Sequence, residues 1–147
     1  MDKAAKRLAA MQWVYGDGDK KALTELERRI AAVGRTVNDF VNYSQLVSGV
    51  TFKLPNVNGG KSFEICEWTN LDRAIIGNFL GRISADSYQE GRFLSSALVI
   101  GVDSNGPGEG FFSLAEEAGL LTSKDETMRL TFWIENIRQA RAWYASH

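Results

Sequence analysis

The sequence predicts an α+β fold with an N-terminal helical hairpin, a small central sheet and a long C-terminal helix. Apolar residues recur at helical spacing near both ends of the chain, and a largely apolar run at 94–102 is typical of a central strand. Between the two ends of the chain, the expected helices and strands do not alternate regularly. The 147 residues suffice for a single domain, made of a hairpin at 1–35, compatible with an appended element, and a core at 36–147.

The composition disfavours several functional classes. With 17 basic and 18 acidic residues the net charge is −1, which disfavours nucleic acid as a partner. The single cysteine, Cys66, and the single histidine, His147, allow no disulfide framework, no multi-cysteine zinc site and no interior catalytic histidine. No apolar run approaches the ~20 residues of a membrane span, and no export signal is visible. We therefore expect a cytoplasmic protein without a metal, a cofactor or a membrane partner.

Two helices are expected at the N-terminus. Residues 3–15 carry apolar side chains at helical spacing, and a second helix extends from its N-cap, Asp19, to Val33. Gly34 then closes that helix. Because the turn at 16–19 is short, we expect the two helices to pair as a hairpin.

Short elements are expected in the middle of the chain. A strand at 36–40 and one or two helical turns at 43–47 precede a turn-rich loop at 55–61. Residues 62–68 alternate in character and predict a strand. Within that strand Cys66 would be a small buried apolar side chain.

Two consecutive helices are expected next. Asn70 is a candidate N-cap for a helix at 71–80, which Gly81 ends or kinks. Ser84 is then the N-cap of a second, short helix that ends at Gly91.

Three elements complete the predicted fold. The run at 94–102 forms a central strand covered on both faces. A loop at 103–110 leads into a helix at 111–118 that Gly119 closes. A capping box at 123–126 begins the C-terminal helix, of about twenty residues.

The candidate ligand site is the loop Gly106-Pro107-Gly108-Glu109-Gly110, between the predicted strand and a helix. Free amides at a helix N-terminus bind anions, although Phe111 stands where the dinucleotide fingerprint requires a third glycine. The other side chains expected to contact a ligand are Tyr43, Arg82, Arg92, Ser95 and Ser96. The two arginines would clamp a phosphate or carboxylate, or alternatively form surface ion pairs with Asp86 or Glu90.

Part of the chain resembles a group of small bacterial proteins that have no established activity. The resemblance covers roughly residues 36–144. Three segments carry it: Leu80-Gly81-Arg82-Ile83-Ser84, the run from Gly91 to Ile100, and the run from Gly106 to Ala115. In that group a G-R-x-L-L-S-x-V-V-V strand precedes P-G-x-G-F-F-x-L-A and a C-terminal helix. The resemblance adds weight to the glycine loop and implies no chemistry.

Three functions follow from these features. We predict a non-catalytic binding protein that recognises a partner protein or a small anionic ligand through the 106–110 loop, and a homodimer is compatible with this. The alternative is a winged-helix-like DNA-binding regulator whose helix at 71–80 enters the groove. The third is an enzyme for a phosphorylated or nucleotide substrate. Its candidate groups are Arg82, Arg92 or Lys61 for charge stabilisation and Glu64, Glu67 or Asp103 as base.

Overall fold

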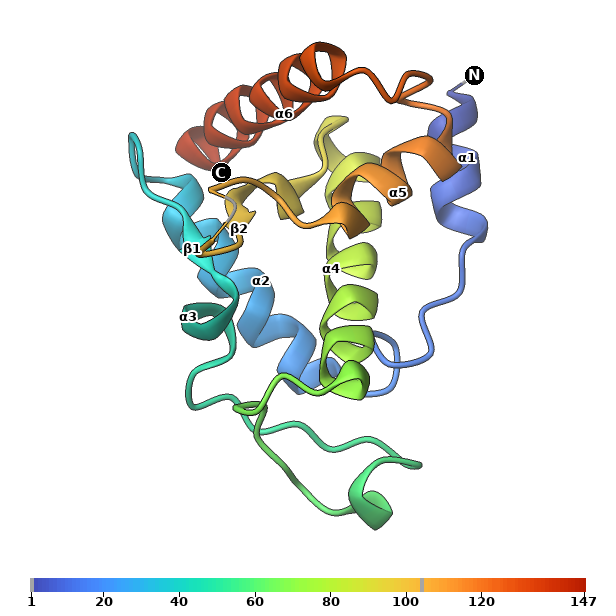
Figure 1. Ribbon diagram of the computed structural model, residues 1–147, viewed down its shortest axis with the longest axis vertical. Coiled ribbons are helices and arrows are strands. Elements are labelled where there is room, and N and C mark those ends of the chain that lie inside the picture. The colour runs from blue at the N-terminus through green and yellow to red at the C-terminus, as the bar shows by residue number, and fades with distance from the viewer. Residues whose placement is uncertain (1, 104) are drawn as a thin grey trace.

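The computed structural model describes residues 2–103 and 105–147. Figure 1 shows α4 as a central helix with α1 and α2 on either side of it, and α6 beyond its C-terminal end. The fold class is confirmed: helices dominate, and the two short strands pair in parallel, Val41 with Val99. In chain order the elements are α1 (Lys3–Ala10), α2 (Lys20–Gly34), β1 (Val41–Asn42), α3 (Tyr43–Val47), η1 (Asn58–Gly60), α4 (Asn70–Gly91), η2 (Ser95–Leu98), β2 (Val99–Ile100), α5 (Glu109–Ala118) and α6 (Glu126–Ser146).

The first helix is shorter than its apolar spacing predicts. Asp2 caps α1, and the helix ends at Ala10 instead of continuing to residue 15. The amides of Tyr15 and Gly16 instead donate to the Asn78 side-chain oxygen, each at 2.9 Å. The longer connection lets α1 pack on α4 and α5, whereas α2 packs on α3, α4 and α6.

The two helices expected between residues 71 and 91 are one continuous helix of 22 residues, α4. Its N-cap is Thr69, which forms a capping box with Asp72, so the expectation that Asn70 caps it is wrong. Gly81 neither ends nor kinks the helix. A Cβ there would lie 2.3 Å from the Trp13 ring, so glycine is required by close packing and not by helix termination.

Ser84 does not cap a new helix, because its side chain makes a tertiary contact instead. It lies fully buried in α4, accepts the Ser96 amide at 3.0 Å and donates to the Ser96 hydroxyl at 2.7 Å. One turn further on, Ser87 accepts the Ser95 amide at 3.0 Å. On the other side, Asn136 of α6 accepts the Leu94 amide at 2.8 Å.

These contacts explain why residues 94–102 do not form the predicted long strand. The amides of Leu94, Ser95 and Ser96 are bonded to side chains and have none left for a neighbouring strand. The segment begins as the 3₁₀ turn η2, and only Val99–Ile100 is strand. An apolar run of this length does not distinguish a buried strand from another buried conformation.

The strand predicted at 62–68 is also wrong. Only Phe63 pairs, in an isolated antiparallel bridge with Phe52, whose two hydrogen bonds measure 2.8 and 2.9 Å. Cys66 is exposed and is not the buried side chain expected. The strand expected at 36–40 lies at Val41–Asn42 instead.

The last two helices agree closely with the prediction. Helix α5 ends at Gly119, which adopts φ of +80° as a left-handed cap. Helix α6 starts three residues after Ser123, and its N-cap is Asp125, which accepts the Met128 amide at 3.1 Å. The capping box expected from Ser123 is therefore wrong by two residues, although the helix it signals is present.

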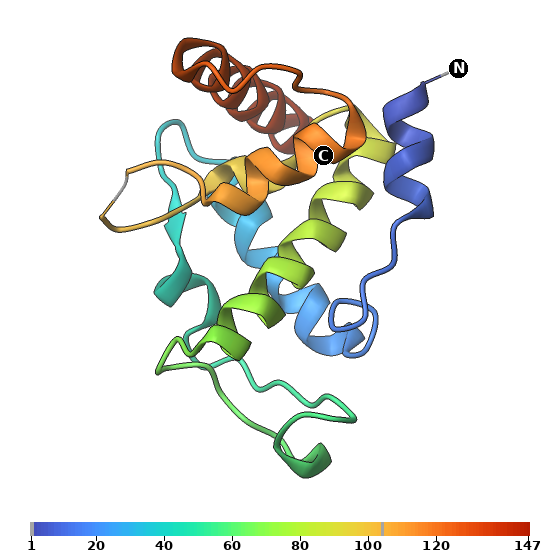
Figure 2. The same ribbon diagram turned by 45° about the vertical axis from the view of Figure 1, so that its right-hand side comes forward.

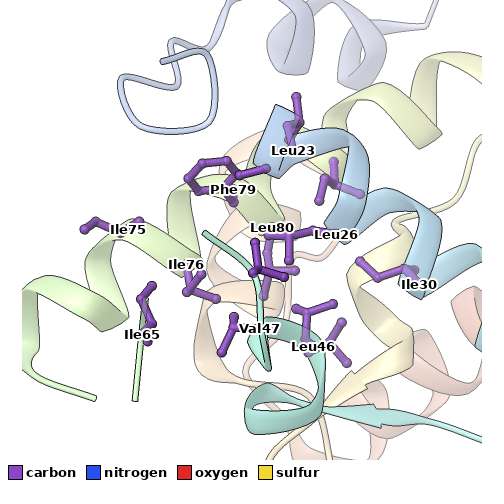
Figure 3. Packing of buried hydrophobic residues seen from close by; sticks show 14 of the residues in the cluster. Leu23, Leu26, Ile30, Leu46, Val47, Ile65, Ile75, Ile76, Phe79 and Leu80 are labelled. Carbon is purple, nitrogen blue, oxygen red and sulfur yellow. The ribbon is translucent and has the colours of Figure 1, made fainter. Parts of the chain in front are cut away.

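The apolar side chains gather in two clusters. Figure 3 shows part of the larger one, where Leu26 and Ile30 of α2 face Ile76 and Leu80 of α4, with Leu46 and Val47 of α3 beside them. The smaller cluster joins α1, α5 and the C-terminal half of α4, with contributions from the loop after α5. Both N-terminal helices therefore supply core residues.

Two glycines of α4 offer a matched test of this packing. A Cβ at Gly77 would meet no atom within 4 Å, whereas one at Gly81 would strike Trp13. We expect Gly77→Ala to stabilise the protein by about 0.5–1 kcal/mol, because alanine restricts the unfolded chain and favours helix. Gly81→Ala is expected to destabilise it by about 1–3 kcal/mol, since the indole must move. Urea unfolding of both variants measures this, and equal effects of one sign would contradict it.

The contact between Ser84 and η2 can be tested in the same way. Ser84→Ala leaves the buried amide of Ser96 without its acceptor, which costs about 1–3 kcal/mol. Ser113→Ala on the exposed face of α5 removes a similar hydroxyl and is expected to stay within about 0.5 kcal/mol of the parent. The free energies of unfolding compare the two, and a Ser84→Ala cost no larger than that of Ser113→Ala would refute the contact's importance.

Candidate functional site

A cavity of about 600 Å³ lies between the N-terminal half of α4 and the start of α5. Figure 2 shows α5 crossing α4, with the loop that precedes α5 extending to one side. The lining comes from five parts of the chain: α3, the loop before α4, α4 itself, η2 and α5 with its preceding loop. The lining residues are Tyr43, Trp68, Arg73, Ile76, Gly77, Leu80, Gly81, Ser96, Gly108, Glu109, Gly110, Phe111 and Leu114.

The walls of the cavity are mostly apolar. Ile76 and Leu80 of α4 form one wall, and Phe111 and Leu114 of α5 the other. Trp68 is a half-buried lining residue in a left-handed conformation with φ of +55°. Its ring packs edge-on against the Tyr43 ring, with the two centroids 6.0 Å apart. Ligand cavities of this size in proteins are typically apolar with a few oriented polar groups.

Tyr43 and Gly108 determine each other's position. Burial raises the pKa of the Tyr43 phenol above its ordinary value, and a hydrogen bond with the Gly108 backbone offsets part of that increase. A Cβ at Gly108 would lie 2.2 Å from the phenol oxygen. Glycine is therefore required here for close approach, since its φ of −67° is open to any residue.

The charge in the cavity lining comes from Arg73 and Glu109. The Glu109 carboxylate is highly exposed and pairs with Arg129 at 3.0 Å. Arg73 is exposed, and among the described residues no ion pair or hydrogen bond engages its guanidinium. The neighbouring N-cap of α5, Gly108, contributes no side-chain cap to the helix N-terminus. The site therefore offers a positive charge without a partner.

Ser96 supplies the most deeply placed polar group. It is 6% exposed, and its hydroxyl accepts from Ser84 at 2.7 Å, so its own proton is free to donate. Ser96 reaches the cavity because η2 is held against α4 by the side-chain contacts described above.

The structure brings together part of the predicted site. Gly108, Gly110, Tyr43 and Ser96 all line the cavity. Gly106 does not, because it closes the preceding loop, where its carbonyl accepts the Gly101 amide at 3.0 Å.

The other three predicted residues lie elsewhere. Arg82 forms the surface ion pair with Asp86 that was the stated alternative, and it also pairs with Asp17, which was not expected. Arg92 pairs with Asp2 at 3.0 Å instead of reaching a ligand. Ser95 is fully buried and lines a different cavity, further along α4.

Sequence reasoning missed Arg73 and Trp68 as site residues. Arg73 lies one turn before Gly77 on α4, and Gly77 is the glycine whose missing side chain leaves open space. The spacing of Arg73, Gly77 and Gly81 on one helical face was a usable signal. Trp68 lies in an irregular loop, where no periodicity indicates its direction.

The two alternative functions find little support in this geometry. Helix α4, proposed to enter DNA, is the central helix and contacts α1, α2, α5 and α6. The candidate enzyme groups Lys61, Glu64 and Glu67 are exposed on the loop before α4, outside the cavity lining.

Comparison of the chain with family models, curated proteins and solved structures found no match. The similarity of residues 36–144 to the small bacterial proteins therefore stays a prediction. Among the described residues no helix is long and apolar enough to cross a membrane, and no cluster of three or more histidine, cysteine or acidic side chains has the arrangement of a metal site.

A double-mutant cycle tests the contact between Tyr43 and Gly108 in the cavity lining. Gly108→Ala forces a methyl group onto the Tyr43 oxygen and is expected to cost about 1–3 kcal/mol of stability. In a Tyr43→Phe background the nearest ring atom, Cζ, lies 3.4 Å away, so the same change is expected to cost much less. Urea denaturation of the four proteins gives the coupling free energy. Additive effects would show that the two residues do not constrain each other.

Proposed function

We propose that this protein binds a small molecule with an apolar body and an anionic group, in the cavity between α4 and α5. The observation that carries the proposal is one apolar cavity of about 600 Å³ with a cation at its edge that has no partner among the described residues. A volume of this order suits a drug-sized ligand.

The apolar walls favour a ligand with a hydrocarbon or aromatic body. Phe111 and Leu114 face Ile76 and Leu80 across the space, and burying apolar surface between them contributes about 25 cal/mol per Å². Trp68 in the lining supplies a large, rigid contact surface. These apolar groups contribute to the affinity for the ligand but do little to fix its orientation.

The polar groups favour an anion at one end. Arg73 offers planar donors suited to a carboxylate or phosphate, and the adjacent N-terminus of α5 carries a partial positive charge. The Glu109 carboxylate opposes an anion, but its pairing with Arg129 reduces that effect. The Ser96 hydroxyl provides a further donor inside the cavity.

Binding explains these features better than catalysis. The polar side chains of the lining are Tyr43, Arg73, Ser96 and Glu109. Ser96 is paired with another serine, so no base activates it as a nucleophile. The favoured function is therefore recognition or carriage of the ligand.

Native mass spectrometry of freshly purified protein tests whether a ligand is carried from the cell. We expect an additional mass of a few hundred daltons, which Gly77→Leu abolishes by placing a side chain in the open space. A Ser113→Leu variant, on the exposed face of α5, is the control that retains it. A mass that survives Gly77→Leu would locate the ligand outside this cavity.

A pair of fluorescent probes tests the anionic preference. 8-Anilinonaphthalene-1-sulfonate carries a sulfonate, and N-phenyl-1-naphthylamine has the same rings without it. We expect Arg73→Gln to weaken binding of the sulfonate about tenfold, the effect of one charge-assisted hydrogen bond, and to leave the neutral probe unchanged. Arg138→Gln, on the exposed face of α6, is the matched control. Equal binding of the two probes to the parent protein would contradict an anion site.

A further inference from the structure

A second cavity, of about 310 Å³, lies between α2, the C-terminal half of α4 and the end of α6. It shares no lining residue with the first. Its lining combines three carboxylates, two aromatic rings and the hydroxyls of two buried serines. The lining residues are Thr24, Glu27, Arg28, Ala31, Ile83, Asp86, Ser87, Glu90, Ser95, Trp143 and Tyr144.

The carboxylates give this cavity a negative charge that the protein neutralises only in part. Asp86 pairs with Arg82 at 2.9 Å, but among the described residues Glu27 and Glu90 have no cationic partner. Arg28 at the edge pairs with Glu25 instead, at 2.6 Å. Burial raises the pKa of Glu27, and the nearby charges of Asp86 and Glu90 raise it further.

Ser95 is the independent observation that points to a ligand. The residue is fully buried, lines the cavity, and its hydroxyl makes no hydrogen bond within the described structure. The hydroxyl lies near enough to the Tyr144 phenol to lower its pKa, which burial raises, but the geometry falls short of a hydrogen bond. Buried polar groups are nearly always bonded, so an orphan facing a cavity is best explained by a missing partner.

We propose that this cavity binds the ammonium group of a small primary alkylamine. Such a group has three N–H donors, which match the carboxylates of Glu27 and Glu90 and the hydroxyl oxygen of Ser95. The alkyl chain would lie against Ile83, Trp143 and Tyr144. A metal ion is a poorer match, since the described acidic side chains do not form a metal-binding group.

The site is independent of the cavity between α4 and α5 and of the function proposed for it. It lies on the opposite side of η2, where Ser95 faces one cavity and Ser96 the other. The two sites also select opposite charges, so a single ligand class does not satisfy both.

Titration of ¹⁵N-labelled protein with butylammonium, followed by NMR, tests the proposal. We expect saturable shifts of the Ser95 amide and the Trp143 indole, with a Kd on the order of 1 mM. Butan-1-ol has the same chain with a hydroxyl in place of the ammonium group and should bind at least tenfold more weakly. Equal binding of the two compounds, or no saturation with either, would overturn the proposal.

Single substitutions test which residues contact the bound amine. We expect Glu27→Gln to weaken butylammonium binding about tenfold and Ser95→Ala about threefold. Neither change removes a hydrogen bond of the described structure, so thermal unfolding should show both variants folded. Glu117→Gln removes the same charge from the exposed face of α5 and should leave the affinity unchanged. Parent-like affinity in Glu27→Gln, or displacement of the amine by stoichiometric Ca²⁺, would overturn the assignment.

Discussion

The structure depends on the way α4 and α6 hold residues 93–97 by their backbone. Ser84, Ser87 and Asn136 accept three consecutive amides of this segment, and Ser87 also donates to the Phe93 carbonyl at 2.8 Å. The Trp133 indole donates to the Ala97 carbonyl at 2.9 Å. The bonds made by Ser84, Ser87 and Asn136 are buried, and the Trp133 bond is partly buried. A buried backbone group without a partner costs more free energy than a hydrogen bond gains. The segment therefore has one conformation compatible with the core, and it joins the larger and the smaller apolar clusters.

The elements on either side take their positions from this segment. Strand β2 continues directly from η2 and pairs with β1, which places α3 and its Tyr43 beside the loop that precedes α5. Consecutive residues of η2 then line different cavities: Ser96 lines the one that includes Arg73, and Ser95 lines the one that includes Glu27. A two-strand sheet contributes little stability alone, so its function here is to fix the direction of the chain between the two sites.

The sequence predicted the fold class, both terminal helices and α5, because local signals determine these elements: apolar periodicity, N-caps and a closing glycine. It failed where a residue with a local preference is used for a tertiary contact. Gly81 and Ser84 together are typical of a helix end followed by a new start, but Gly81 admits Trp13 and Ser84 binds η2. The strand at 94–102 failed for the same reason, since side chains distant in sequence took its amides.

The candidate site was partly predictable on similar grounds. Gly108 and Gly110 were selected because they lie in a glycine-rich loop at a helix N-terminus, where free amides bind anions. The structure shows a different requirement at Gly108, where a Cβ would strike the Tyr43 phenol of α3, whereas a Cβ at Gly110 would meet no atom within 4 Å. Arg82 and Arg92 were selected by proximity to the loop in sequence, yet each has an acidic partner on another element, Asp17 and Asp2. An arginine is available to a ligand only when the fold leaves it unpaired, which composition does not reveal. Arg73 meets that condition because the described chain places no carboxylate against it. Among the described residues, α4 therefore carries one unpaired cation near its start, Arg73, and one unpaired anion near its end, Glu90.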